Sequence, residues 1–377
     1  MTQTAPSATL KDVVTAAVAT YGGADAPRLG AQWTPLSMDE ISRADPNLGS
    51  AMEKRGFSGQ VNVNLQTGEI IIADRGTANL KNVVTDAGVA VDTIANSQQV
   101  AESFARAGLV AAQTKLKQAG VEMSAVYTTG HSLGGAESEM QAGMLSCAID
   151  SHGAPLVPIG VPITNVSLDA PGIAGLANRG NRDRYASYNF SSQGDIVHLS
   201  GGSDLKGTTE VSLPVGPPMR STAGLIVGGA ALAAAAPGPG WLAGGVMAIE
   251  GLDNAAHAHS SMLLHNAASN TALGDVPMPQ LNAGMSSGQL QDLFQASQSQ
   301  YKAVADAADA VAASAGYAPN RNSATSLGLF GLDENGRIDP ALAKDGAGHA
   351  SADVDQWLEA NSQHERAQPQ PQPKFSM

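Results

Sequence analysis

The sequence predicts an α/β fold with a mostly parallel central sheet. Between residues 61 and 190, short apolar segments with the period of strands alternate with longer segments of helical spacing. Parallel strands need long crossovers, and a helix is the usual one. A second observation is the pentapeptide Gly-His-Ser-Leu-Gly at 130–134, which lies between a predicted strand and a predicted helix. With 377 residues, the chain is long enough for one large domain or two smaller ones.

The first elements are predicted to be a helix and then a hairpin. Apolar residues recur every three or four positions over residues 8–22, which indicates a helix. Residues 33–56 have the pattern of short helices and turns. Alternating apolar and polar residues at 61–65, a Gln-Thr-Gly turn and an apolar run at 69–73 indicate two strands, the second of them buried.

The next segments predict the parallel part of the sheet. Residues 78–120 have helical spacing, with a possible break near Asn96. A strand is expected at 123–129, followed by a helix of small residues at 133–149. The remaining predicted strands are 163–168 and 185–190.

The composition excludes several classes of function. The chain has 21 Lys and Arg against 34 Asp and Glu, a net charge of −13, so nucleic acid is not an expected partner. The single cysteine, Cys147, excludes an intrachain disulfide and a zinc site built from cysteines, and we expect it to be a small buried apolar group. The N-terminus lacks the pattern of a signal peptide, so we expect synthesis in the cytoplasm without a cleaved signal.

An uncharged segment, residues 221–249, is dominated by Ala, Gly, Leu and Val and is interrupted by Pro237–Gly240. Its first half is too short to span a bilayer. Three interpretations stay open: a buried pair of helices, a lid that contacts lipid, or a hairpin that inserts into a membrane.

We predict three parts of the chain. Residues 1–285 form the α/β domain, which includes the uncharged segment. Residues 286–345 form a helical extension that begins with a long polar helix at 286–316, and residues 346–377 form a flexible tail that contains Gln-Pro repeats.

A short acidic sequence at 333–339 resembles part of a calcium loop. It lacks an acid at the first and twelfth positions, which are Gly331 and Leu342. A turn at Asn335-Gly336 is therefore the stronger interpretation, and no metal ion or cofactor is expected.

Gly130-His131-Ser132-Leu133-Gly134 fits the nucleophile-elbow pattern. In this motif the chain turns sharply from a strand into a helix and holds the serine in a strained backbone conformation. Side chains two residues before and after the serine would collide, so both positions need glycine. The N-terminus of the helix faces the serine and favours developing negative charge. The pattern therefore indicates a serine nucleophile.

A second motif, Arg75-Gly76-Thr77, directly follows the buried strand. Together with the elbow some 55 residues later, it resembles the class 3 lipase family. The resemblance implies an α/β-hydrolase fold and hydrolysis of ester bonds in triacylglycerols or phospholipids. It also implies an oxyanion hole made by the backbone N–H of Thr77, its hydroxyl group, and the backbone N–H of Leu133.

The acid of a Ser-His-Asp triad has two candidates. In α/β-hydrolases the chain order is serine, acid, histidine, which points to Asp169 or Asp195. The family has a Gly-x-Pro strand end at the first position and an Asp-x-Val motif at the second, so the resemblance assigns Asp195. Asp169 stands where the family has glycine. It is either a hydrogen-bond acceptor behind the triad or, more commonly for such an Asp, a solvated turn residue.

The base must follow the acid. The sequence around His259 resembles the histidine segment of the family, and His257 is the second candidate. We expect His265 to face elsewhere, the side chain of His131 to point away from the nucleophile, and His198 to be structural.

The implied mechanism is acyl transfer. His259 takes the proton of Ser132, which attacks an ester carbonyl, and water hydrolyses the acyl-enzyme. The resemblance thus implies a phospholipase or acylglycerol lipase with a lipid ester substrate. Lipases of this type include bacterial effectors exported by specialised secretion systems, for which an inhibitor protein is the expected partner. The alternative is a non-catalytic membrane-active or scaffolding protein that uses residues 221–249.

Overall fold

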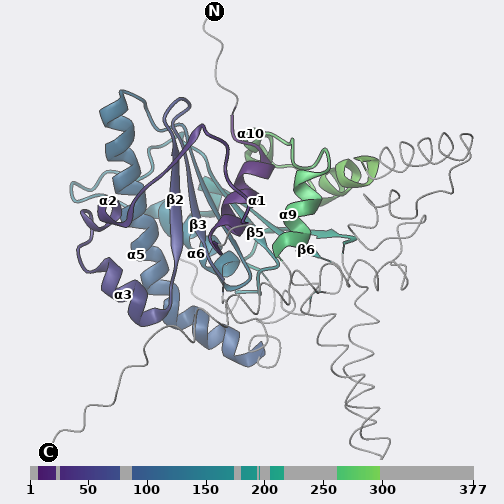
Figure 1. Ribbon diagram of the computed structural model, residues 1–377, viewed down its shortest axis with the longest axis horizontal. Helices are drawn as coiled ribbons and strands as arrows, with labels where there is room; N and C mark the ends of the chain where they lie inside the picture. Colours follow the sequence, from purple (N-terminus) through teal and green to yellow (C-terminus); the bar gives the residue numbers. More distant parts are fainter. Residues whose placement is uncertain are drawn as a thin grey trace, which may run out of the picture. The chain divides into compact units, whose positions relative to one another are not determined.

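The computed structural model describes residues 7–22, 26–76, 87–173, 180–192, 195, 204–215 and 261–297. Within these ranges seven strands form one sheet in the order β1 to β7 (Figure 1). The strands are β1 (Trp33–Pro35), β2 (Gly59–Asn64), β3 (Glu69–Asp74), β4 (Ala125–His131), β5 (Ile163–Leu168), β6 (Tyr185–Ser192) and β7 (Thr209–Leu213). The pairs β1·β2 and β2·β3 are antiparallel, and every later pair is parallel.

Helices cover both faces of this sheet (Figure 1). They are α1 (Leu10–Ala19), α2 (Met38–Ser42), α3 (Leu48–Arg55), α5 (Ala87–Ala119), α6 (Leu133–Cys147), α9 (Ser261–Ser269) and α10 (Met278–Asn282), with a 3-10 turn η1 (Arg182–Arg184). The first face packs against α1, α9 and α10, and the second against α2, α3, α5 and α6. The mostly parallel sheet, with a serine turn between β4 and α6, confirms the predicted α/β-hydrolase fold.

The middle of the sheet is apolar on both sides because its strands are covered on both sides. In β3, Ile70 and Ile72 pack toward α5, whereas Ile71 packs toward α1, and all three are fully buried. Each buried side chain of this size contributes roughly 1.5–3 kcal/mol of hydrophobic free energy. This packing holds the carboxyl ends of the parallel strands in a fixed arrangement.

Several predicted elements are confirmed with small shifts of their ends. The helix predicted at 8–22 is α1, the hairpin is β2 and β3, and the small-residue helix is α6. The strand expected at 163–168 is β5 without any shift, and β6 extends the strand expected at 185–190 by two residues.

The short helices predicted within 33–56 are confirmed as α2 and α3, but the segment also contains a short strand, β1, because Trp33 and Thr34 pair with the edge of β2. Two predictions are wrong. Helix α5 runs through Asn96 without a break, since tertiary packing outweighs the weak helix propensity of one asparagine. Cys147 is exposed at the end of α6, and its Sγ lies 3.4 Å from the carbonyl of Met144, so it is not a buried apolar group.

A buried carboxylate fixes the start of the described chain. Glu69 lies at the N-terminal end of β3 and accepts the backbone N–H of Ala8 at 3.0 and 3.1 Å. It also accepts the hydroxyls of Thr67 at 2.7 Å and Tyr127 at 2.9 Å. These hydrogen bonds compensate for burial of the charge and anchor the segment before α1 to the sheet.

Some predictions lie outside the described residues: the segment 221–249, the acidic sequence 333–339 and the tail 346–377. Of the polar helix predicted at 286–316, the described part shows helix at 287–297. The three-part division of the chain stays a prediction. No helix among the described residues is long and apolar enough to cross a membrane.

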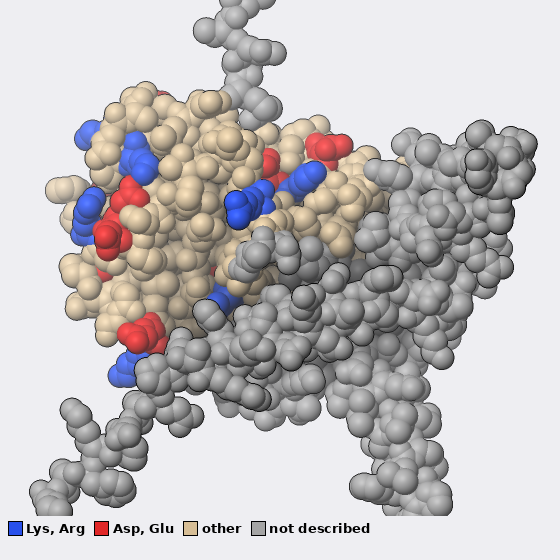
Figure 2. Space-filling model, viewed as in Figure 1, with Lys and Arg blue, Asp and Glu red and all other residues tan. Residues whose placement is uncertain are grey.

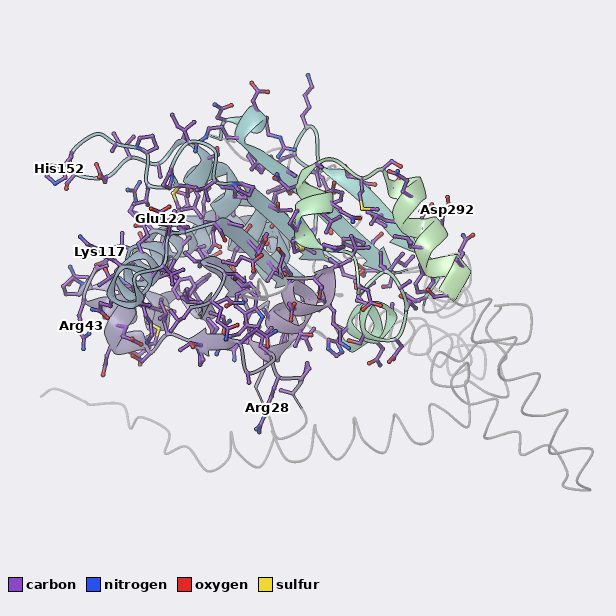
Figure 3. All side chains as sticks on the ribbon, turned by 90° about the horizontal axis from the view of Figure 1, so that it is seen from above. Arg28, Arg43, Lys117, Glu122, His152 and Asp292 are labelled. Atoms are coloured by element: carbon purple, nitrogen blue, oxygen red, sulfur yellow. The ribbon has the colours of Figure 1, made fainter. Side chains whose placement is uncertain are left out.

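Charged side chains are sparse on the described surface. Figure 2 shows a few Lys, Arg, Asp and Glu residues scattered over one face, without a large cluster of one sign. Residues at the periphery carry charge, as Figure 3 shows for Arg28, Arg43, Lys117, Glu122 and Asp292. On this face, the described residues therefore lack the basic cluster that a nucleic-acid surface needs.

Candidate active site

Ser132 lies at the junction of β4 and α6 with a strained backbone. Its φ of 58° and ψ of −129° are in a region that L residues rarely adopt. Its N–H donates to the carbonyl of Leu168 on β5 at 2.8 Å, and its carbonyl accepts the N–H of Gly135 at 2.9 Å. The turn is thus fixed to the neighbouring strand on one side and to the helix on the other.

Two glycines make this turn sterically possible. A Cβ at Gly130 would lie 2.3 Å from the backbone of Gly134. A Cβ at Gly134 would lie 2.5 Å from the carbonyl oxygen of Asp74 at the end of β3. Both distances are far inside van der Waals contact, so the strand, the helix and the loop after β3 meet only because these side chains are absent.

The loop after β3 reaches the serine through Gly76. A Cβ at Gly76 would lie 2.4 Å from the carbonyl oxygen of His131 and 3.0 Å from Cβ of Ser132. The next residue, Thr77, lies outside the described residues. Leu133 is the first residue of α6, where N–H groups have no partner within the helix. The N-terminus of α6 is therefore a site for negative charge beside Ser132.

His131 is buried behind the turn and contacts Tyr21, which follows α1. The phenol oxygen of Tyr21 lies 2.8 Å from Nδ1 of His131, and the rings meet edge to face. The phenol also takes a hydrogen bond from the backbone of Gly76, and burial raises the pKa of Tyr21. Sequence reasoning missed Tyr21, since 110 residues separate it from its partner and nothing local marks it.

Asp195 follows β6 and is fully buried. Its N–H donates to the carbonyl of Ser192 at 3.3 Å, which fixes it near the carboxyl end of β6. Asp169 directly follows β5, is also fully buried, and forms a side-chain hydrogen bond with Asp195. Of the two alternatives for Asp169, the structure shows the buried one, so it is not a solvated turn residue.

The histidines divide into described and undescribed ones. His259, His257 and His198 lie outside the described residues, so the structure does not place the base. His265 on α9 lies 3.3 Å from the hydroxyl of Thr15 on α1, and burial lowers its pKa. His265 thus lies between α1 and α9.

Buried acids under the turn are a feature that sequence reasoning missed. Glu137 on α6 is buried, and desolvation raises its pKa to about 8. Asp74 ends β3, and burial together with the charge of Glu137 raises its pKa well above the ordinary range. The only sequence signal is a pair of glutamates in a helix otherwise made of small residues.

A third buried acid, Glu139, also lies on α6, and its side chain contacts β6. Desolvation raises the pKa of Glu139 to about 7, although hydrogen bonds from Thr208 and Ser187 act in the opposite direction and lower it. The Ser187 hydroxyl lies 3.2 Å from its Oε1. No cluster of three or more metal-ligating side chains occurs among the described residues.

Comparison with known proteins finds similarity among solved structures. No family model and no curated protein matches this chain. The chain is similar to the Lip2 lipase of Yarrowia lipolytica, with 18% identity over 55% of this chain and 81% of that one and a TM-score of 0.36. It is similar to a triacylglycerol lipase of Penicillium expansum, with 13% identity over 54% and 78% and a TM-score of 0.36. A third is the Rhizomucor miehei lipase in complex with its propeptide, with 17% identity over 54% and 67% and a TM-score of 0.34.

Proposed function

We propose that this protein is a serine ester hydrolase in which Ser132 is the nucleophile. The observation that carries the proposal is the strained strand–serine–helix turn, with Gly76 packed against Ser132. Such strain costs about 1–3 kcal/mol and clusters at active sites, where a turn of this kind positions a serine hydroxyl for reaction.

The proposed mechanism is two-step acyl transfer. His259 takes the Ser132 proton as the oxygen attacks the ester carbonyl, and it then gives that proton to the leaving alcohol. The N–H groups of Leu133 and Thr77, with the Thr77 hydroxyl, hold the oxyanion. Water, deprotonated by His259, releases the acid and restores Ser132. Asp195 orients His259 and stabilises its charged form.

We propose a lipid ester, a phospholipid or an acylglycerol, as the substrate. An apolar cluster adjoins the nucleophile, and Leu133, next to Ser132, packs against it. Its buried members are Ala136, Met140, Ile173 and Leu205. Leu133 is only partly buried, so an apolar side chain backed by this cluster lies next to Ser132, which supports an apolar acyl chain beside the ester carbonyl.

The test compares the full-length protein with Ser132→Ala and the matched control Ser138→Ala. Ser138 is on helix α6, which follows Ser132, but its hydroxyl is buried and donates a hydrogen bond to the carbonyl of Gly135 at 2.8 Å. A fluorophosphonate probe should label wild type and the control and spare Ser132→Ala, and release of fatty acid from mixed phospholipid and triacylglycerol vesicles should follow the same pattern. Equal labelling of Ser132→Ala would overturn the nucleophile assignment.

Variants of the other proposed residues test the triad. His259→Ala and Asp195→Asn should each lose at least about 1,000-fold in kcat, since the members of a triad act as a unit. The same experiment addresses the second candidate, a non-catalytic membrane-active protein. That candidate predicts that the probe fails to label Ser132 in wild type and that deletion of residues 223–247 abolishes membrane binding.

An exported effector with a cognate inhibitor protein is a further part of the proposal. A small inhibitor encoded next to this gene, which blocks ester hydrolysis by the purified enzyme, is the expected finding. Hydrolysis that is unaffected by every neighbouring gene product would speak against this part and leave the chemistry of Ser132 intact.

A further inference from the structure

Asp169 has a backbone conformation that glycine adopts more easily than aspartate. Its φ is 47°, in the left-handed region that glycine adopts freely and other L residues adopt at a cost of about 1–2 kcal/mol. It is also fully buried, where an unpaired carboxylate is expensive. A glycine would remove both costs, so the carboxyl group itself needs an explanation.

The surroundings of Asp169 hold its carboxyl group in one orientation. Its N–H donates to the carbonyl of Phe190 at 2.7 Å. The next residue, Ala170, is bound through both its N–H and its carbonyl to the side chain of Asn189, at 3.3 and 3.2 Å. Two successive residues of the turn after β5 are thus held to β6 by hydrogen bonds.

Ser192 provides hydrogen-bond donors to this carboxyl group. Its backbone N–H donates to Oδ1 of Asp169 at 2.8 Å, and its hydroxyl lies 3.1 and 3.3 Å from Oδ1 and Oδ2. The remaining hydrogen bond of Asp169 is to the side chain of Asp195. Two carboxylates cannot accept from each other, so this contact requires a proton on one of them.

The surroundings of Asp169 favour the shared proton on this residue. Burial, and next the negative charge of Asp195, raise the pKa of Asp169 well above the ordinary range. Asp195, which follows β6, is the charged group that acts on Asp169, and Ser192, the last residue of β6, is the polar donor. With the proton on Asp169, its O–H donates to Asp195, which keeps its charge.

We propose that Asp169 is a positioning residue whose carboxyl O–H donates to Asp195 and fixes that carboxylate for the catalytic histidine. The proposal rests on the proposed function, because it takes Asp195 to be the triad acid. A carboxylate without this donor can rotate, and more of its negative charge is available to the histidine that it orients. Asp169 thus sets both the orientation and the basicity of the triad.

The test uses two substitutions with opposite expectations. Asp169→Gly keeps the backbone conformation without strain but removes the donor, so kcat should fall about 10- to 100-fold with little change in KM. The acid limb of the pH profile should move to higher pH, since the less delocalised charge on Asp195 raises the pKa of the histidine. Asp169→Asn should recover most of the lost activity, because its carbonyl accepts from Ser192 and its amide donates to Asp195.

A matched control and a second readout keep the outcomes separate. Glu69→Gln changes a buried carboxylate at the opposite end of the sheet, so it should lower stability and leave the pH profile unchanged. Infrared difference spectra of wild type against Asp169→Asn at neutral pH should show the C=O stretch of a protonated carboxyl in wild type, with or without ester hydrolysis.

The two proposals fail in different ways. The proposed role of Asp169 is wrong if Asp169→Gly has the kcat and pH profile of wild type, or if Asp169→Asn is as impaired as Asp169→Gly. Neither result contradicts the proposed role of Ser132 as the nucleophile. Absence of the infrared band also overturns the shared proton. Loss of ester hydrolysis in wild type itself would instead contradict the proposed function.

Discussion

The phenol of Tyr21 and the imidazole of His131 form a hydrogen bond of 2.8 Å that connects the residues after α1 to the residue before Ser132. The same phenol oxygen also accepts a hydrogen bond from the backbone of Gly76. One hydroxyl therefore ties together the two loops that meet at Ser132.

Tyr21→Phe should lower kcat about tenfold with KM nearly unchanged, because the Gly76 loop loses the hydroxyl that fixes it beside the oxyanion. The folded state should lose about 1–3 kcal/mol, because the variant removes two hydrogen bonds that each contribute about 1 kcal/mol. Tyr127→Phe is the control: it removes a hydroxyl that donates to Glu69 at 2.9 Å, at the far end of the sheet. Steady-state kinetics and urea unfolding measure both effects, and equal loss of kcat in the two variants would contradict the role of Tyr21.

Gly134→Ala should unfold the turn or displace β3, since its Cβ would lie 2.5 Å from the carbonyl oxygen of Asp74. We expect a loss of about 1–3 kcal/mol in the free energy of unfolding, with ester hydrolysis abolished. Gly49→Ala in α3 is the counterpart, because the added methyl group would meet nothing within 4 Å. It should gain about 0.5–1 kcal/mol from helix propensity and keep full activity.

Ser132→Gly should make the protein more stable than Ser132→Ala by about 1 kcal/mol, although both variants lack the nucleophile. Glycine adopts the φ of 58° without the clash that alanine retains. Thermal unfolding of the two variants side by side measures the difference. Equal stabilities would mean that the turn stores no strain.

Glu139→Gln should flatten the dependence of stability on pH. The folded protein holds the proton of Glu139 up to a pKa of about 7, whereas the unfolded chain releases it near 4.5. Stability contributed by this group is therefore present at low pH and is lost as pH rises from about 4.5 to 7, a change of about 3 kcal/mol. Glutamine keeps the acceptor for Ser187 but cannot ionise. Urea unfolding of both proteins at pH 5 and pH 8 checks this, and parallel curves would exclude Glu139 as the titrating group.

The sequence predicted the centre of the fold and the turn because both have local patterns. The buried strands β3 and β5 are continuous apolar or mixed runs bounded by turn residues, and Ser132 has glycines at fixed offsets on each side. The edge strands β1 and β7 were not predicted, since strands of three and five residues have too few positions to show a period.

The supporting residues of the site could not be predicted, for a different physical reason. Asp169 has the sequence context of a solvated turn, Asp-Ala-Pro-Gly, and only the approach of Ser192 from the next strand makes it a buried acid. Glu137 looks like the polar side of a surface helix, but α6 is enclosed by β4, β5 and α5, so the glutamate has no outward face. Tertiary packing, which no local pattern contains, decides both cases.

The hydrogen bonds between Ala8 and Glu69 have a practical consequence for handling the protein. Glu69 is the first residue of β3 and is paired with Ala125, the first residue of β4. Ser132 follows the last residue of β4. At about 3.3 Å per residue along the strand, Glu69 and Ser132 are about 20 Å apart, at opposite ends of the sheet. An affinity tag or fluorescent fusion placed ahead of Ala8 is thus attached at the end of the sheet away from Ser132, which makes this end of the chain the first choice for immobilising the protein.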